Sequence, residues 1–92
     1  MAQASVGSWF VYILRCADGS FYTGITKEVR RRFQQHNAGT ASRYTRSRLP
    51  VRLVHQEAVL DQRAALKREA AIKALSRRQK EKLIRQRRRK AS

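Results

Sequence analysis

The sequence is short of cysteine and of long apolar runs, and each shortage excludes a class of protein. Cys16 is the single cysteine of the 92 residues, so no disulfide can form within the chain and a cysteine-rich zinc site is excluded. No stretch approaches the roughly 18 apolar residues of a membrane-spanning helix. The first eight residues also lack the basic start and apolar run of a signal peptide. We therefore expect a protein of a reducing, cytoplasmic compartment.

Carboxylates are scarce as well. The six acidic residues are Asp18, Glu28, Glu57, Asp61, Glu69 and Glu81. No two of them have the spacing of paired metal ligands, and a site with two catalytic metal ions normally needs several carboxylates. One Mg²⁺ held by a single carboxylate, by waters and by a substrate phosphate is feasible. For Glu69, the alternative is an exposed ion pair with Lys73, four residues later on a helix.

Positive charge, in contrast, is abundant. The chain has 22 Lys and Arg and a formal net charge of +16. Such an excess indicates a polyanionic partner, and nucleic acid is the first candidate because each phosphate neutralised by Lys or Arg releases condensed counterions. A solvated or ribosome-associated basic surface is one alternative. An anionic membrane surface is the other, and we do not favour it because the basic C-terminal run, residues 77–90, lacks a long apolar face.

The length fits one domain. Residues 1–8 are small and polar and are expected to be a flexible N-terminus. Residues 9–85 are expected to form a single domain, and residues 86–92 a basic C-terminal tail. Residues 38–50 form a long polar and basic loop, and loops of that length in a compact domain are often functional.

Apolar patterning and turn signals predict a β-hairpin followed by a helix, a third strand and two more helices. The predicted strands are residues 9–16, 21–25 and 51–58, and the predicted helices are residues 26–37, 62–74 and 76–86. Both faces of the first strand are apolar, which indicates a sheet with helices on both sides. The fold class is therefore α/β of the α+β type.

The predicted helices have recognisable ends. Thr26 and Asp61 are expected to cap the first and second helices, and Gly39 to end the first. Residues 76–79, Ser-Arg-Arg-Gln, match a capping box at the start of the third. The core-facing residues of the second helix and its end are expected to be Leu66, Ala70 and Leu75.

Two tyrosines, Tyr12 and Tyr22, flank the hairpin turn, and the turn length decides whether they can cooperate. A two-residue loop would place them on opposite faces, whereas a three-residue loop pairs Tyr12 with Gly24 and puts both tyrosines on one face. We favour the three-residue loop, because Gly19 stands where such a turn needs a left-handed residue. Gly24 is then expected to leave space for a phosphate or hydrated metal. Taken alone, both tyrosines would be ordinary strand aromatics.

The helix after the hairpin carries a second group of polar residues. Val29 and Phe33 define its buried stripe, and a rotation of about 100° per residue puts Arg32 and His36 together at the edge of that stripe. Both can then point back toward the sheet. Arg31 is turned further away, as a solvated charge or a contact to a phosphate backbone. For His36 alone, a surface or structural role is the alternative.

These residues, in this order, resemble the GIY-YIG nuclease superfamily. The residues that carry the resemblance are Phe10-Val11-Tyr12, Tyr22-Thr23-Gly24, Arg32, His36 and Glu69. The sequences Arg-Tyr-Thr-Arg at 43–46, Pro50 and Ala-Leu-Lys-Arg-Glu at 65–69 are similar to the small stand-alone bacterial members. The first motif keeps only the tyrosine of Gly-Ile-Tyr, and Thr23 replaces an isoleucine in the second. No asparagine follows Asn37, although some family enzymes use one near the site.

The resemblance implies a small three-stranded antiparallel sheet flanked by helices and a metal-dependent endonuclease that hydrolyses phosphodiester bonds, in DNA rather than RNA, in repair or processing. It further implies that Tyr12 and Tyr22 line the active site, that Arg32 holds the scissile phosphate, that His36 assists proton transfer and that Glu69 binds one Mg²⁺ or Mn²⁺. The attacking water is expected to lose its proton to Tyr12, and sharing of this role with Tyr22 is the alternative. We expect Arg32 and the metal to lower the pKa of Tyr12.

Substrate binding is expected to involve further residues near these positions. The expected nucleic-acid contacts are Gly24, Arg31, Arg43, Tyr44, Arg46, Arg48 and Lys73. No segment is evident that would recognise bases, so the shape of the nucleic acid or a protein partner is expected to supply specificity. The alternative function is a non-catalytic, basic nucleic-acid-binding module on the same fold. The sequence does not define an oligomeric state.

Overall fold

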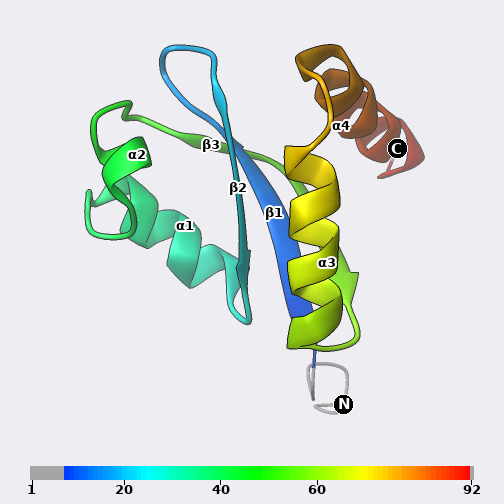
Figure 1. Cartoon of the computed structure of the whole chain (residues 1–92). Helices are drawn as coiled ribbons and strands as arrows, with labels where there is room; N and C mark the ends of the chain where they lie inside the picture. Colours follow the sequence, from blue (N-terminus) through cyan, green and yellow to red (C-terminus); the bar gives the residue numbers. More distant parts are fainter. Residues whose placement is uncertain (1–7, 92) are drawn as a thin grey trace.

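A three-stranded antiparallel sheet forms the centre of the molecule, with helices on both sides (Figure 1). The computed structural model describes residues 8–91, and the side chains of residues 8–86. The strands are β1 (Trp9–Arg15), β2 (Phe21–Thr26) and β3 (Arg52–Val59). The helices are α1 (Val29–Asn37), α2 (Arg43–Arg46), α3 (Gln62–Lys73) and α4 (Arg77–Ala91). The strand order is β2–β1–β3, and the predicted fold class is confirmed.

The hairpin adopts the three-residue loop. Tyr12 pairs with Gly24, and Leu14 pairs with Tyr22. The turn is closed by hydrogen bonds from the Cys16 amide to the Ser20 carbonyl (2.8 Å) and from the Gly19 amide to the Cys16 carbonyl (2.9 Å). Gly19 has a φ of 87°, a conformation that costs little only for glycine. The predicted register is therefore confirmed, and both tyrosines lie on one face of the sheet.

Each face of β1 packs into its own apolar cluster, as the pattern of the strand predicted. Val11 and Ile13 pack with Ala65 and Ile72 of α3 and with Ile84 of α4. On the opposite face, the buried residues are Tyr12, Leu14, Cys16 and Val51, and the half-buried residues packed against them include Val29 and Phe33 of α1. Helices α1 and α2 lie on this second side of the sheet, and α3 and α4 on the first (Figure 1).

The start of α1 differs from the prediction. The capping position is Glu28, whose side chain makes no capping hydrogen bond, and Thr26 lies two residues before it. The Thr26 hydroxyl instead accepts a hydrogen bond from the Glu28 amide (3.1 Å), which shapes the turn between β2 and the helix. The end of α1 is as predicted, with Gly39 in the left-handed region at a φ of 81°.

Helix α3 begins as predicted but presents a different face to the sheet. The Asp61 carboxylate accepts a hydrogen bond from the Ala64 amide (2.8 Å) and caps the helix. The buried residues are Ala65 and Ile72, whereas Leu66 is 50% exposed and Ala70 is also exposed. The predicted core positions Leu66 and Ala70 are therefore wrong, and Leu75, beyond the helix, is half-buried.

Helix α4 starts at the predicted capping box. The Gln79 amide donates to the Ser76 hydroxyl (3.2 Å), and the Ser76 amide donates to the Gln79 side chain (2.9 Å). The helix continues to Ala91, past the predicted end near Gln86. The predicted flexible N-terminus lies outside the described residues, apart from Ser8. Within residues 8–91, no helix is apolar over a length sufficient to cross a bilayer.

Candidate active site

A buried chain of hydrogen bonds connects three elements on the α1 side of the sheet. The Tyr12 hydroxyl of β1 lies 2.9 Å from Nε2 of His36 in α1. His36 Nδ1 lies 2.8 Å from the hydroxyl of Thr45 in α2. His36 and Thr45 are 1% and 0% exposed, and Tyr12 is 3% exposed. The predicted proximity of Tyr12 and His36 is thus present, as a direct hydrogen bond.

The hydrogen bonds of Thr45 favour one tautomer of His36. The Thr45 hydroxyl lies 3.4 Å from the Ser42 carbonyl oxygen, which can only accept a hydrogen bond. If Thr45 donates to that carbonyl, His36 Nδ1 donates to Thr45, and Nε2 is left to accept the Tyr12 proton. Burial, with a smaller contribution from the Arg32 charge, lowers the pKa of His36 below its ordinary 6.5. The imidazole is therefore neutral at neutral pH and can accept a proton from Tyr12.

The pKa of Tyr12 is raised, contrary to the expectation from sequence. Burial is the main cause, and the neighbouring Tyr22 phenol raises the pKa further. Arg32 lowers it, as expected, while the Glu69 carboxylate raises it. Desolvation of the phenolate outweighs the attraction to Arg32. Tyr12 therefore keeps its proton at neutral pH, and these contributions place both Arg32 and Glu69 within electrostatic range of its phenol.

Gly24 provides room for Tyr12. A Cβ atom on residue 24 would lie 2.6 Å from the Tyr12 hydroxyl oxygen and 2.7 Å from Cζ. The phenol therefore lies across the glycine of the neighbouring strand, and the expected open space for a phosphate or hydrated metal over Gly24 is wrong. The glycine permits the approach of Tyr12 to His36.

Aromatic rings extend the site from Tyr12 toward the surface. Tyr22 packs edge-on against His36, with ring centroids 5.0 Å apart, and its centroid lies 6.4 Å from that of Tyr12. Tyr44 of α2 stacks on Tyr22 at 6.0 Å, and the Arg48 guanidinium lies 3.9 Å from the Tyr44 ring centroid. Arg48 also pairs with Asp18 of the hairpin turn (3.1 Å), which fastens the loop after α2 to the hairpin.

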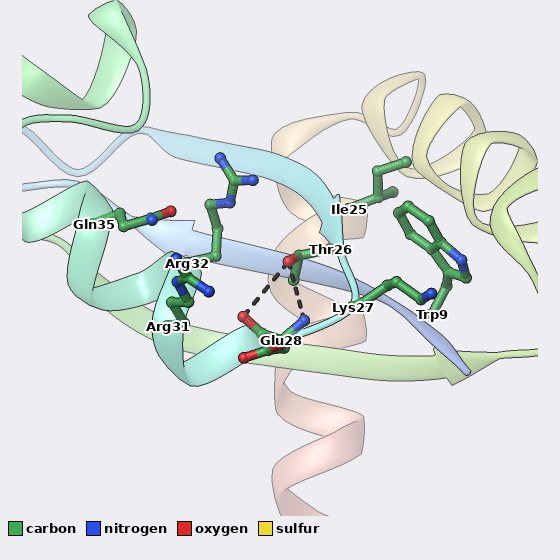
Figure 2. Close-up of a pocket in the computed structure, with 8 residues that line it drawn as sticks. All are labelled: Trp9, Ile25, Thr26, Lys27, Glu28, Arg31, Arg32 and Gln35. Carbon is green, nitrogen blue, oxygen red and sulfur yellow. Dashed lines mark hydrogen bonds between the residues drawn. The ribbon is translucent and has the colours of Figure 1, made fainter. Parts of the chain in front are cut away.

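Arg32 lies beside a surface hollow at the outer end of β2 (Figure 2). The hollow has a volume of about 360 Å³ and includes Trp9, Lys27 and Arg31 in its lining. Figure 2 shows Trp9 and Lys27 side by side, at the opposite end from Gln35 of α1. Within the described residues, the Arg32 side chain has no hydrogen-bond or ion-pair partner, so its guanidinium is available to bind an anion.

Glu69 of α3 is the acid whose charge acts on Tyr12, and within the described residues its carboxylate pairs with Lys73. Lys73 Nζ lies 3.3 Å from Glu69 Oε2, and the Glu69 side chain is 20% exposed. The alternative ion pair that the sequence left open is therefore formed. Among the described residues, no three His, Cys, Asp or Glu side chains are grouped to hold a metal ion. Glu69 supplies one carboxylate, so a divalent metal held there would take its remaining ligands from water and substrate phosphate.

The remaining expected nucleic-acid contacts are distributed around this site. Arg43 and Arg46 are exposed on α2, and Arg31 is exposed beside the hollow. Arg48 and Lys73 are held in the ion pairs described above. Thr45, which fixes the orientation of His36, was not predicted. The signal that could have indicated it is Ser42 three residues earlier, whose side chain caps α2 by accepting from the Thr45 amide (3.1 Å).

The fold and this constellation define a nuclease class, and comparison with known proteins agrees. Residues 8–82 match the GIY-YIG catalytic domain, so the chain belongs to the GIY-YIG family of nucleases. Its relatives are small stand-alone members named UPF0213 proteins. One from Desulfotalea psychrophila is 53% identical over 84% of this chain and 71% of the relative. Another, from Natronomonas pharaonis, is 51% identical over 82% and 88%.

Solved structures agree with the fold. The solution structure of a UPF0213 protein from Bacillus halodurans has a TM-score of 0.54 and 47% sequence identity, and covers 84% of this chain and 82% of its own. A solution structure of a protein from E. faecalis has a TM-score of 0.59 and 44% identity, with coverages of 86% and 84%.

Proposed function

We propose that this protein is a divalent-metal-dependent endonuclease that hydrolyses phosphodiester bonds in DNA. The observation that carries the proposal is the buried hydrogen bond between Tyr12 and His36, whose pKa is lowered by burial, with an Arg32 guanidinium that has no partner among the described residues. A strand tyrosine in a structural role needs no buried base, whereas a proton-transferring tyrosine does. The choice of DNA over RNA, and a role in repair or processing in the cytoplasm, rest on the family resemblance.

The mechanism is hydrolysis by an attacking water. The water oxygen forms a bond to phosphorus and loses a proton to the Tyr12 hydroxyl, while Tyr12 passes its own proton to Nε2 of His36. This transfer avoids a free phenolate, which the raised pKa of Tyr12 makes unfavourable. Arg32 binds the non-bridging oxygens and stabilises their developing negative charge. The bond between phosphorus and the leaving oxygen breaks, and that oxygen takes a proton from solvent.

Tyr22 and Thr45 act as positioning residues. Tyr22 packs against the His36 ring, and Thr45 holds His36 Nδ1, so the imidazole keeps Nε2 directed at Tyr12. Glu69 would hold one Mg²⁺ or Mn²⁺, which supplies positive charge for the phosphate and the leaving oxygen. Lys73, the present partner of Glu69, would then be free to contact the nucleic acid.

The test is a cleavage assay on labelled DNA and RNA, single-stranded, nicked and branched, with Mg²⁺ or Mn²⁺. Tyr12→Phe is expected to slow cleavage by about 10²- to 10⁴-fold, the usual contribution of a proton-transfer group. Glu69→Ala is also expected to slow cleavage, because it removes the carboxylate that would hold the metal. The matched control for Glu69→Ala is Glu81→Ala. Glu81 also forms an ion pair with a residue four positions away, at 3.1 Å from Arg77, but on α4. Wild-type cleavage rates in both Tyr12→Phe and Glu69→Ala would refute the assignment.

A non-catalytic nucleic-acid-binding module is the second candidate, and the net charge of +16 is the observation that favours it. This function predicts binding that weakens with salt and no cleavage of any substrate with any metal. Metal-dependent cleavage that the Tyr12 and Glu69 variants abolish would exclude it.

A further inference from the structure

Two arginines lie directly opposite each other at one end of the sheet. Arg15 of β1 pairs in register with Arg52 of β3, and side chains at paired positions share a face. Like charges placed opposite each other in this way destabilise a sheet. Among the described residues, neither side chain has an ion-pair or hydrogen-bond partner that would offset the repulsion.

The two arginines belong to a larger basic hollow. A cavity of about 500 Å³ lies between this end of the sheet and α4, and a third arginine, Arg85, extends into its lining from the helix. Half-buried or buried apolar side chains complete the lining: Phe21, Val54 and Ile84. The single acid there, Glu81, is already paired with Arg77 at 3.1 Å. Arg77 itself lies 4.6 Å from the Phe21 ring centroid and donates to the Gly19 carbonyl, so α4 is fixed to the hairpin.

This hollow is distinct from the candidate active site. Arg15 follows Val11 and Ile13 on the face of β1 that packs against α3 and α4, whereas Tyr12 points to the opposite face, toward α1. The sheet therefore separates the hollow from Tyr12 and His36, and Figure 1 shows α4 on the side of the sheet away from α1. None of the residues assigned to cleavage or to substrate contact above lines it.

We propose that the hollow defined by Arg15, Arg52 and Arg85 binds backbone phosphates of a second segment of the nucleic-acid substrate. Three guanidinium groups lie around one concavity, and the one acid among its described lining residues, Glu81, is already paired with Arg77, so the guanidinium groups provide several N–H donors for phosphate oxygens. A bound phosphate would also offset the repulsion between Arg15 and Arg52. A flat membrane surface fits less well, because the apolar residues lie within the hollow rather than protruding. The inference rests on the proposed function only in taking nucleic acid as the ligand.

The test measures binding of labelled single-stranded and duplex DNA in EDTA, so that the readout does not depend on cleavage. Removal of two phosphate contacts in Arg15→Gln/Arg52→Gln should reduce the slope of log K against log salt concentration by about 1.4 on single strands and about 1.8 on duplex, from roughly 0.7 and 0.9 per phosphate. Arg85→Gln, on a different element, should reduce it by about half as much. The control is Arg63→Gln/Lys67→Gln, two exposed positions on α3 with the same change in net charge.

A substitution that improves the fold provides an independent check. Arg52→Glu creates an opposite-charge pair with Arg15, so the melting temperature should rise while DNA affinity falls. The difference in affinity between wild type and Arg15→Gln/Arg52→Gln should also disappear below a threshold oligonucleotide length, because a short strand cannot occupy both sites.

Three results would overturn the proposal. They are a salt slope that is unchanged in Arg15→Gln/Arg52→Gln, an equal reduction in the α3 control, and a loss of binding to anionic lipid vesicles without any loss for DNA. If DNA is never cleaved but the slope falls as expected, the proposed nuclease function fails and the phosphate site stands.

Discussion

Gly24, which has no side chain, determines where the Tyr12 phenol can lie in the candidate site. The Tyr12 phenol crosses Gly24 on the adjacent strand and meets His36 beyond it. A methyl group on residue 24 would lie 2.6 Å from the phenol oxygen, a separation closer than van der Waals contact. Tyr12 is 3% exposed, so its ring has little room to move aside. The hydrogen bond to His36 therefore depends on the absence of a side chain at position 24.

We expect Gly24→Ala to lower the free energy of unfolding by about 1–3 kcal/mol, the usual cost of overpacking a core. It should also reduce cleavage, since Tyr12 must leave His36. The measurement is denaturant unfolding within a double-mutant cycle. In a Tyr12→Leu background the ring is gone, so Gly24→Ala should cost much less there. Equal costs in both backgrounds would show that the clash is not the cause.

The sequence predicted which residues form this site better than it predicted how those residues are buried and hydrogen-bonded. Tyr12, His36 and Arg32 were identified from their spacing and from the family resemblance. The structure joins Tyr12 to His36 by a hydrogen bond, and the Arg32 charge acts to lower the pKa of both. The raised pKa of Tyr12 was not predicted, because desolvation depends on packing from both α1 and α2 that spacing does not reveal. Thr45 was missed for the same reason, since Ser42 three residues earlier indicates a helix start but not that the Thr45 hydroxyl is buried against an imidazole.

At the scale of elements, the register of the hairpin was predictable and the buried face of α3 was not. The register followed from one glycine in a turn, a local constraint that is fully present in the sequence. On α3, Arg68 and Glu69 lie one turn from both Ala65 and Ile72, on the same face of the helix as these buried residues. A hydrophobic pattern nevertheless assigns them to solvent. Both side chains are only partly exposed, and each forms an ion pair: Arg68 with Glu57, and Glu69 with Lys73. Polar residues on the inner face of a helix are invisible to a search for apolar periodicity.

The contact between β3 and α3 depends on one carboxylate with two partners. Glu57 accepts hydrogen bonds from Arg68 Nε (2.8 Å) and Nη2 (2.9 Å), and its other contact is His55 Nε2 at 2.7 Å. The hydrogen bonds from Arg68 hold the pKa of Glu57 below its ordinary value, against the effect of burial. The His55 side chain is fully buried, so its position relies on the same carboxylate.

Arg68→Ala is expected to cost about 1–2 kcal/mol of stability, since Arg68 is 39% exposed and its charge-assisted hydrogen bonds are partly screened. Arg63→Ala, at an exposed position on the same helix, should cost much less. The difference between the two variants, measured by denaturant unfolding, should shrink as the pH falls below about 4.5, because a protonated Glu57 no longer needs Arg68. A difference that does not vary with pH would mean that packing of the Arg68 stem, not the charge, is responsible.

At the scale of the whole molecule, groups that titrate lower the stability of the fold both at acid and at alkaline pH. Burial and Arg32 lower the pKa of His36 from 6.5, so the unfolded chain binds that proton more readily and stability falls as the pH drops below about 6.5. On the alkaline side, burial raises the pKa of Cys16 from 9.0 and that of Tyr12 from 10.0. The unfolded chain then loses these protons first, so stability falls as the pH rises above about 9. Maximum stability is expected between these limits.

His36→Gln isolates the acid side of this profile. Glutamine retains a polar side chain beside Tyr12 but does not titrate, so the variant should melt at a lower temperature than wild type at pH 7 and should lose less of its stability between pH 6.5 and pH 5. Melting temperatures recorded across that range for both proteins provide the measurement. If the melting temperatures of the two proteins fall equally between pH 6.5 and pH 5, a group other than His36 causes the loss of stability at acid pH. The proposal that His36 is a neutral, buried acceptor for the Tyr12 proton would then lose its support, even if cleavage is observed.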